Sequence, residues 1–268
     1  MQLFYKKIII SLVMDLLWLQ VPRWKKRDGL LHGFLGRCGG KSAGPYASLN
    51  LSFRIGDDPQ VVKDNICDVK RAVGVHGGRI VTMKQMHGDQ ILEVKDRDIK
   101  EAGEADGMVT EESGIFLAAL TADCVPILFS VSGRKLAAVV HAGWRGTLAG
   151  IAAKMVNHLK ERYHVKPASL EVALGPAIGP CCYEIGPDVS LPLVQRWGEL
   201  AERCLHAEGD KNFLDLRVLN ALLLEKAGVP HTQIFDVGPC TGCASEDFFS
   251  YRHEKKETGR QLSFIGWL

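Results

Sequence analysis

Short apolar runs that come in blocks, without strict alternation with helical stretches, are the feature that most restricts the fold of this chain. The runs cover residues 80–83, 115–120, 125–131, 136–140 and 170–174, and each is strand-like in length and content. Strands that come in blocks favour an α+β protein with mixed β-sheets over a doubly wound fold, in which strands and helices alternate strictly. We therefore predict the α+β class.

Several helical stretches are expected beside these strands. The sequence Asp-Asp-Pro at 57–59 supplies a capping carboxylate and a proline at the first helical position, and it predicts a helix that stops at Gly74. Apolar residues between 148 and 159 follow the helical period without a miss. Residues 194–205 and 214–227 are also expected to be helical.

No linker, repeat or low-complexity tract divides the chain, which favours a single domain over residues 30–268. Residues 1–29 are interpreted as an N-terminal extension that includes the first strand. An apolar run at its start resembles a secretion signal, but Asp15 interrupts the run and no cleavage site of small residues follows it. The run is also too short and too charged to span a membrane. We expect Met14 to be the physiological start, with residues 1–13 non-native and loosely packed.

The charge balance and the cysteine count exclude two further classes. The chain has 33 Lys and Arg against 31 Asp and Glu, a formal net charge of +2, which argues against a nucleic-acid-binding surface. Eight cysteines in 268 residues are too few for a disulfide scaffold. Because several cysteines stand beside His, Asp or Pro, we predict reduced thiols and a cytoplasmic protein. We expect neither nucleic acid nor a membrane as a partner.

Three predicted strand ends carry side chains that suit a metal ion, namely His87, Cys124 and His141. Two imidazoles and a thiolate are good zinc ligands, and three protein ligands leave the fourth tetrahedral position for water or substrate. Their spacing matches no local metal motif. On the pattern alone, three structural side chains are the more common interpretation.

A second set of potential ligands lies further along the chain. An H-x-E pattern that begins at His206, followed by Cys240 and Cys243, spells the signature of zinc nucleobase deaminases. His206 is expected at the end of a helix, whereas that chemistry needs a helix start, so we interpret the match as coincidental and keep it as a rival. Cys181 and Cys182 could join Cys240 and Cys243 in a structural zinc site or a redox pair, although adjacent cysteines are awkward co-ligands and packing is the commoner role.

A glycine-rich segment at 36–42 ends like a phosphate-binding P-loop, but Leu35 stands where the first glycine is required. Arg37 and Lys41 in this segment are still candidate ligands for an anion. A solvated basic turn is an equally good interpretation.

Taken together, the motifs resemble those of the YfiH/YlmD laccase-domain family, and in particular its Bacillus-type members. The resemblance covers the chain from about residue 30 to its C-terminus. The segments that carry it are HGF at 32–34, GGKS at 39–42, GPYASLNL at 44–51, GDDP at 56–59, QMHG at 85–88, ADG at 105–107, TADCVP at 121–126, HAGWRG at 141–146, GPAIG at 175–179, FFSYR at 248–252 and TGR at 258–260. Met86 replaces the valine more usual in the family.

The resemblance implies a four-layer α/β/β/α sandwich and a zinc-dependent purine nucleoside enzyme. The implied activities are phosphorolysis of adenosine, inosine, guanosine and methylthioadenosine, and deamination of adenosine to inosine. The implied metal ligands are His87, Cys124 and His141, with zinc as the cofactor and copper as an adventitious alternative. A copper oxidase is a poor interpretation, because none of the nine histidines forms a His-x-His pair.

Further roles follow from the implied activity. Asp123, next to Cys124, is the candidate catalytic carboxylate, which would orient a ligand histidine or move a proton. Arg37, Lys41, Arg145 and Arg252 are the phosphate candidates, with Arg37 preferred. The expected partners are purine nucleosides and phosphate, in a monomer or weak homo-oligomer.

Two other function classes stay open. In a cysteine hydrolase, Cys124 would be the nucleophile and His141 its base. In a non-catalytic partner protein, for example one used in envelope maintenance, zinc would only stabilise the fold.

Overall fold

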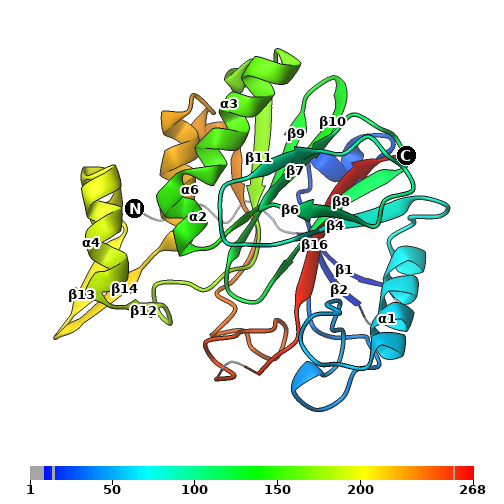
Figure 1. Cartoon of the computed structure of the whole chain (residues 1–268), viewed down its shortest axis with the longest axis horizontal. Helices are drawn as coiled ribbons and strands as arrows, with labels where there is room; N and C mark the ends of the chain where they lie inside the picture. Colours follow the sequence, from blue (N-terminus) through cyan, green and yellow to red (C-terminus); the bar gives the residue numbers. More distant parts are fainter. Residues whose placement is uncertain (1–8, 14–15, 256) are drawn as a thin grey trace.

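Two β-sheets packed face to face form the centre of the computed structural model, which describes residues 9–13, 16–255 and 257–268 (Figure 1). The first sheet contains, in spatial order, β1 (Ile9–Val13), β2 (Leu16–Gln20), β3 (Leu30–Leu35), β16 (Gln261–Trp267), β8 (Ile115–Thr121), β4 (Arg79–Lys84) and β6 (Glu101–Glu104). The second contains β15 (Ile234–Asp236), β11 (Leu170–Leu174), β9 (Val125–Val131), β10 (Arg134–Ala142), β7 (Gly107–Thr110) and β5 (Ile91–Glu93). Both sheets mix parallel and antiparallel pairs.

Helices cover the outer face of each sheet. Helix α1 (Pro59–Ala72) lies on the first sheet, whereas α2 (Trp144–Ala149), α3 (Ile151–Tyr163) and α6 (Leu216–Lys226) lie on the second (Figure 1). Next to them, α4 (Pro187–Trp197) and α5 (Glu199–Glu202) accompany a small sheet of β12 (Glu184–Ile185), β14 (Lys211–Leu214) and β13 (Leu205–Glu208). The predicted α+β class and its four-layer α/β/β/α arrangement are confirmed.

Each of the three layer contacts has its own apolar core. Val69 of α1 packs with Phe116 and Phe264 of the first sheet. Val81 of that sheet packs in the second core, between the two sheets, where Leu128 of the other sheet also lies. A third core joins the second sheet to α3 and α6. Because both faces of the central strands are covered, most of their side chains are apolar on either face, which explains the nearly continuous apolar runs of the sequence.

Two predicted helices are divided in the structure. The stretch at 148–159 belongs to α2 and α3, which meet at Gly150, whose φ of 82° ends one helix and starts the next. The stretch at 194–205 is helical only in part, because α4 ends at Trp197, where Gly198 takes a φ of 55°, and Leu205 already belongs to β13. His206 therefore lies in strand β13. The prediction that it stands at the end of a helix is wrong.

The N-terminal prediction is tested only over part of its length. The backbone of residues 9–13, which we expected to pack loosely, pairs with β2 in antiparallel register. Met14, the expected start, lies outside the described residues. Within the described part of the chain, no helix combines the length and the apolar character needed to cross a bilayer.

Candidate metal centre and pocket

Three loop and strand ends bring His87, Cys124 and His141 together. His87 follows β4 of the first sheet, Cys124 lies in the turn from β8 to β9, and His141 is near the end of β10 in the second sheet. The site therefore lies where the two sheets meet at one end. The potential ligand atoms of the three side chains are all within 4.8 Å of one another, and the two imidazole rings are nearly perpendicular, with centroids 4.8 Å apart. This donor set can hold a metal ion and leave one position open.

A buried carboxylate that the sequence analysis did not single out organises this group. Asp106, between β6 and β7, is 0% exposed, and its Oδ1 lies 2.8 Å from His141 Nδ1. It also accepts hydrogen bonds from the backbone N–H groups of Met86, His87 and Gly88, at 3.1, 3.0 and 2.7 Å. Burial opposes ionisation, but the hydrogen bonds and the His141 charge outweigh it and hold the pKa of Asp106 below its usual value. An ionised Asp106 is only an acceptor, so His141 Nδ1 carries the hydrogen and Nε2 is left free as a ligand.

Local backbone geometry also serves the three side chains. His87 and Asp123 have φ angles of 59° and 93°, in the region that non-glycine residues rarely adopt. Such strain is concentrated at functional sites, and here it directs the turns that hold His87 and Cys124. A glycine is also required at position 143, because a Cβ there would lie 3.1 Å from Cys124 Sγ and 3.1 Å from His87 Cδ2. The glycine keeps the space around both ligands open.

The electrostatics of the group favour a thiolate beside a positive charge. Burial disfavours ionisation of the Cys124 thiol, but the charge of His141 and hydrogen bonds from His141 and His87 outweigh burial and lower its pKa to about 6. Burial opposes charge on His141 as well, yet Cys124 and Asp106 raise the pKa of His141 to about 9. The negative groups therefore stabilise a cation between them, and a bound metal ion would take the place of the proton.

A cavity of about 490 Å³ opens beside the three candidate ligands. Its other walls include Trp144, Tyr183 and Tyr251. A concave site with aromatic walls and a few convergent polar groups is typical of small-molecule binding. Tyr183 is 8% exposed, and its burial raises the pKa of its phenol well above the ordinary value, so that it remains an O–H donor.

Arg145, Arg252 and Arg260 line the same cavity. Among the residues that the structure describes, no carboxylate lies within ion-pair distance of any of the three guanidinium groups. Arg260 belongs to the TGR segment at 258–260, from which the sequence predicts no role for it. Cations without a protein counter-ion next to a cavity make it suitable for an anionic ligand.

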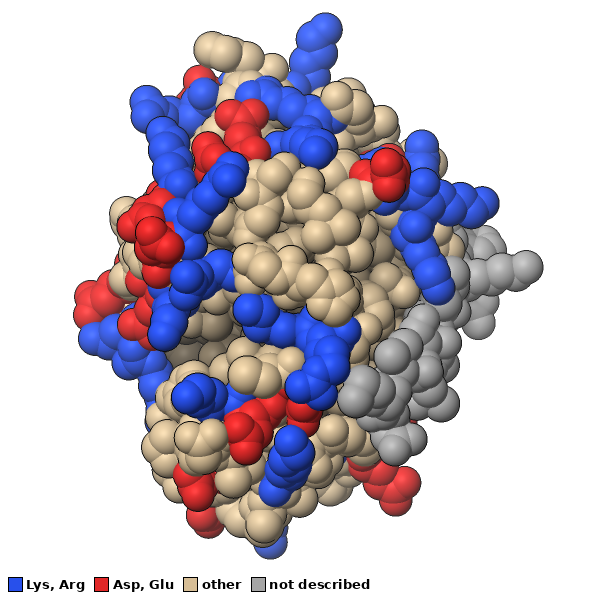
Figure 2. Space-filling view, turned by 90° about the vertical axis from the view of Figure 1, so that its right-hand side faces the viewer, with Lys and Arg blue, Asp and Glu red and all other residues tan. Residues whose placement is uncertain are grey.

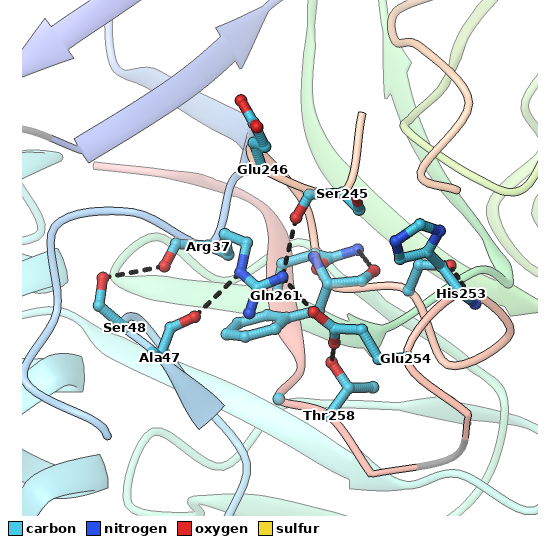
Figure 3. Close-up of polar contacts among 12 residues, drawn as sticks. Arg37, Ala47, Ser48, Ser245, Glu246, His253, Glu254, Thr258 and Gln261 are labelled. Atoms are coloured by element: carbon cyan, nitrogen blue, oxygen red, sulfur yellow. Dashed lines mark hydrogen bonds and ion pairs between the residues drawn. The ribbon is translucent and has the colours of Figure 1, made fainter. Parts of the chain in front are cut away.

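The other two phosphate candidates lie elsewhere. Figure 3 shows that Arg37 forms an ion pair with Glu254 and donates hydrogen bonds to the carbonyl oxygens of Ala47 and Ser245. Its guanidinium also lies over the Phe249 ring, 4.5 Å from the centroid. Lys41 pairs with Asp68 of α1 at 2.6 Å. Neither side chain reaches the cavity walls, so the structure does not bring Arg37 and Lys41 together with the other candidates.

The Asp123 carboxylate is part of the cavity wall, and its hydrogen bonds are made with groups other than the ligand histidines. It accepts hydrogen bonds from the Thr241 and Ser250 hydroxyls at 2.6 and 2.7 Å, and from the Arg252 backbone N–H at 2.7 Å. The carboxylate that contacts a ligand histidine is therefore Asp106. Asp123 joins the turn before Cys124 to two distant loops, one of which carries Arg252.

Charged side chains of both signs lie on one face of the molecule. On the face in Figure 2, Lys and Arg side chains are interspersed with Asp and Glu around a broad area of other residues.

Comparison with known proteins relates this arrangement to a defined group. The family model described as multi-copper polyphenol oxidoreductase laccase matches residues 31–268. The chain is 38% identical over 249 residues to purine nucleoside phosphorylase YlmD of Geobacillus stearothermophilus, covering 89% of this chain and 90% of that protein. It is 36% identical over 250 residues to purine nucleoside phosphorylase YfiH of Escherichia coli, covering 92% and 98%. The crystal structure of the Geobacillus YlmD superposes with a TM-score of 0.87 at 37% identity, covering 93% of this chain and 96% of that one.

Proposed function

Because the chain belongs to the laccase-domain family of YfiH and YlmD, we propose that it is a zinc-dependent purine nucleoside phosphorylase. It would convert adenosine, inosine, guanosine and methylthioadenosine to the free base and the corresponding ribose 1-phosphate. The same site would also deaminate adenosine to inosine. Relatives of this chain bear the name purine nucleoside phosphorylase, which supports the first of these activities.

One observation carries the proposal: the three candidate metal ligands line a single cavity of about 490 Å³ together with three arginines that form no ion pair with the residues the structure describes. Phosphorolysis needs a phosphate beside the ribose C1′ atom and a means of stabilising the purine as it leaves. A cavity with guanidinium groups and a metal position can meet both needs.

Each arginine has a stated task in this scheme. Arg145 and Arg260 bind phosphate oxygens and orient one of them toward C1′, where the new C–O bond forms as the C1′–N9 bond breaks. Arg252 joins them, and Asp123 positions Arg252 through its backbone N–H group at 2.7 Å. The electron pair of the broken bond goes to the purine, which takes up the proton that the attacking hydrogen phosphate loses as its oxygen bonds to C1′. Tyr183, in the cavity wall, offers its O–H group as a hydrogen-bond donor to the purine.

His87, Cys124 and His141 would hold the zinc ion, and Asp106 keeps His141 in the tautomer that leaves Nε2 free. When bound, zinc supplies Lewis acidity and lowers the pKa of a water molecule. In deamination, water adds at the purine C6 atom and ammonia leaves with a proton. Copper in place of zinc would be adventitious.

The test measures adenosine turnover with and without phosphate, with products separated by chromatography, on protein whose metal content is counted. We expect adenine and ribose 1-phosphate only with phosphate, and inosine in both conditions. Cys124→Ala should lose the metal of this site and both activities, whereas Arg97→Ala, at an exposed ion pair with Glu112, should retain both. Metal-loaded protein that forms no product would refute the proposal and favour the non-catalytic partner protein.

A cysteine hydrolase is the second candidate, because the Cys124 pKa of about 6 beside His141 is that of an activated nucleophile. This alternative predicts a covalent adduct of Cys124 with iodoacetamide in metal-free protein and an activity that survives chelation. The phosphorylase proposal predicts that chelation abolishes turnover.

A further inference from the structure

Four cysteines outside the pocket form a second compact group of sulfur atoms. Cys181 and Cys182 lie in the loop after β11, and Cys240 and Cys243 lie in the loop after β15. All four Sγ atoms are within 4.8 Å of one another. The Sγ atom of Cys243 is 3.3 Å from that of Cys181 and 3.5 Å from that of Cys182. His206 of the deaminase-like pattern belongs to neither ligand group among the described residues.

A tight turn allows two adjacent cysteines to face the same point. The Gly179 carbonyl accepts hydrogen bonds from the backbone N–H groups of both Cys182 and Tyr183, each at 3.0 Å. The chain therefore curls around Gly179, and both sulfur atoms approach Cys243. Adjacent cysteines, which we expected to be awkward co-ligands, can thus both approach one metal position.

Two glycines leave the space that the sulfur atoms occupy. A Cβ at Gly242 would lie 3.0 Å from Cys182 Sγ, and a Cβ at Gly179 would lie 3.4 Å from Cys181 Sγ and 3.5 Å from Cys240 Sγ. The Gly179 N–H group donates to Cys240 Sγ at 3.1 Å. Backbone N–H groups directed at cysteine sulfur stabilise thiolates, as they do around metal-bound sulfur.

We propose that Cys181, Cys182, Cys240 and Cys243 bind a second Zn²⁺ ion in a tetrathiolate site. With Zn–S distances of about 2.3 Å, a tetrahedron has S···S edges of about 3.8 Å. Sulfur separations of 3.3 to 4.8 Å bracket that value, so small side-chain rotations suffice to complete the geometry. Four protein ligands fill the coordination sphere, which makes the site structural.

The sulfur arrangement favours a metal over disulfides. A disulfide joins one pair of cysteines, whose two sulfur atoms are about 2.05 Å apart. Here Cys243 lies at nearly equal distances from Cys181 and Cys182, and all four cysteines are free thiols. One centre shared by four sulfur atoms is what a metal ion requires.

The second zinc would connect a loop that lines the pocket to a loop that contacts Asp123 in the pocket wall. Ile178 and Tyr183, on either side of the adjacent cysteines, line the cavity. Thr241, between the other two, donates its hydroxyl hydrogen to Asp123. The metal would thus fix the wall that carries Tyr183 relative to the turn before Cys124.

The test counts zinc by elemental mass spectrometry in protein purified with reductant and excess Zn²⁺ and then desalted. We expect two zinc ions per chain in the unmodified protein, one in a Cys181→Ser/Cys243→Ser double variant and one in Cys124→Ala. Cys67→Ser, which removes an exposed cysteine of α1, is the matched control and should retain both.

Cobalt substitution supplies a readout that does not depend on activity. Co²⁺ added to the metal-free Cys124→Ala protein should give the intense thiolate charge-transfer and visible bands of a tetrahedral sulfur site, and the variant that also carries Cys181→Ser and Cys243→Ser should lack them. A single zinc in the unmodified protein that Cys124→Ala removes would overturn the proposal. A Cys243 disulfide in protein purified with reductant would also overturn it. Failure of nucleoside turnover leaves both readouts intact, so the two proposals fail separately.

Discussion

Replacement of Asp106 by asparagine tests whether one buried carboxylate controls the candidate metal centre. Asp106 Oδ2 accepts from Met86 N and Gly88 N, and Oδ1 accepts from His87 N and lies 2.8 Å from His141 Nδ1. Asparagine has nearly the same shape but only one acceptor oxygen. If that oxygen keeps the hydrogen bonds from Met86 N and Gly88 N, the NH₂ group of the asparagine faces His87 N and His141 Nδ1.

The substitution should therefore reverse the tautomer of His141. Its Nδ1 atom would become the acceptor, and the hydrogen would move to Nε2, which could no longer bind a metal. Loss of such a partner typically weakens metal binding by about 10- to 100-fold, which corresponds to about 1.4–2.7 kcal/mol. The His87 N–H group would also lose its acceptor, at a cost of about 1–3 kcal/mol in the free energy of unfolding.

The assay is a competition titration of Zn²⁺ against a chromophoric chelator, with urea unfolding measured in parallel. Asp106→Asn should raise the Kd of the His87/Cys124/His141 site within this range, in a background where Cys181 and Cys243 are serine. Asp96→Asn, at an exposed position, is the control. An Asp106→Asn protein that binds zinc as tightly as its parent would refute the reasoning.

Three further predictions use other parts of the fold. Gly143→Ala should weaken zinc binding, because the added Cβ would lie 3.1 Å from Cys124 Sγ, and chelator competition measures this. The protein should remain folded by circular dichroism, because the φ of −77° at this position suits alanine. Asp123→Asn should raise the KM for phosphate more than the zinc Kd, since its carboxylate contacts the Arg252 N–H group and neither ligand histidine; unchanged phosphate KM would contradict this. Burial lowers the pKa of His32 from 6.5 to about 3, and the Arg27 charge acts in the same direction. As the pH drops below 6.5, the unfolded chain therefore takes up a proton that the folded chain does not, and the free energy of unfolding decreases. Between pH 7 and 5 this contribution is about 2 kcal/mol, and urea unfolding of His32→Gln, which does not titrate, should show a correspondingly smaller loss.

The central strands could be predicted closely because burial on both faces leaves a clear record in sequence. The runs at 125–131 and 170–174 coincide with β9 and β11. Strand β16 could not be found in this way, although it lies between β3 and β8. It includes Gly266, where a Cβ would lie 2.3 Å from the Ile115 carbonyl oxygen, so close backbone packing takes the place of an apolar side chain there. Such a position has no apolar signal.

The candidate site divides in the same manner, because a ligand type is a property of a residue whereas its availability is a property of the fold. His87, Cys124 and His141 could be selected from their chemistry and their place at strand ends. Whether an arginine is free to bind an anion depends instead on distant carboxylates, and Arg37 is paired with Glu254, 217 positions away. Arg260 has the same side chain but lines the cavity, and its guanidinium donates to the carbonyl oxygens of Thr258 and Gly259 in its own loop. Arg37 stands in a glycine-rich segment, and such a local motif carries no information about a counter-ion that the fold brings from the other end of the chain.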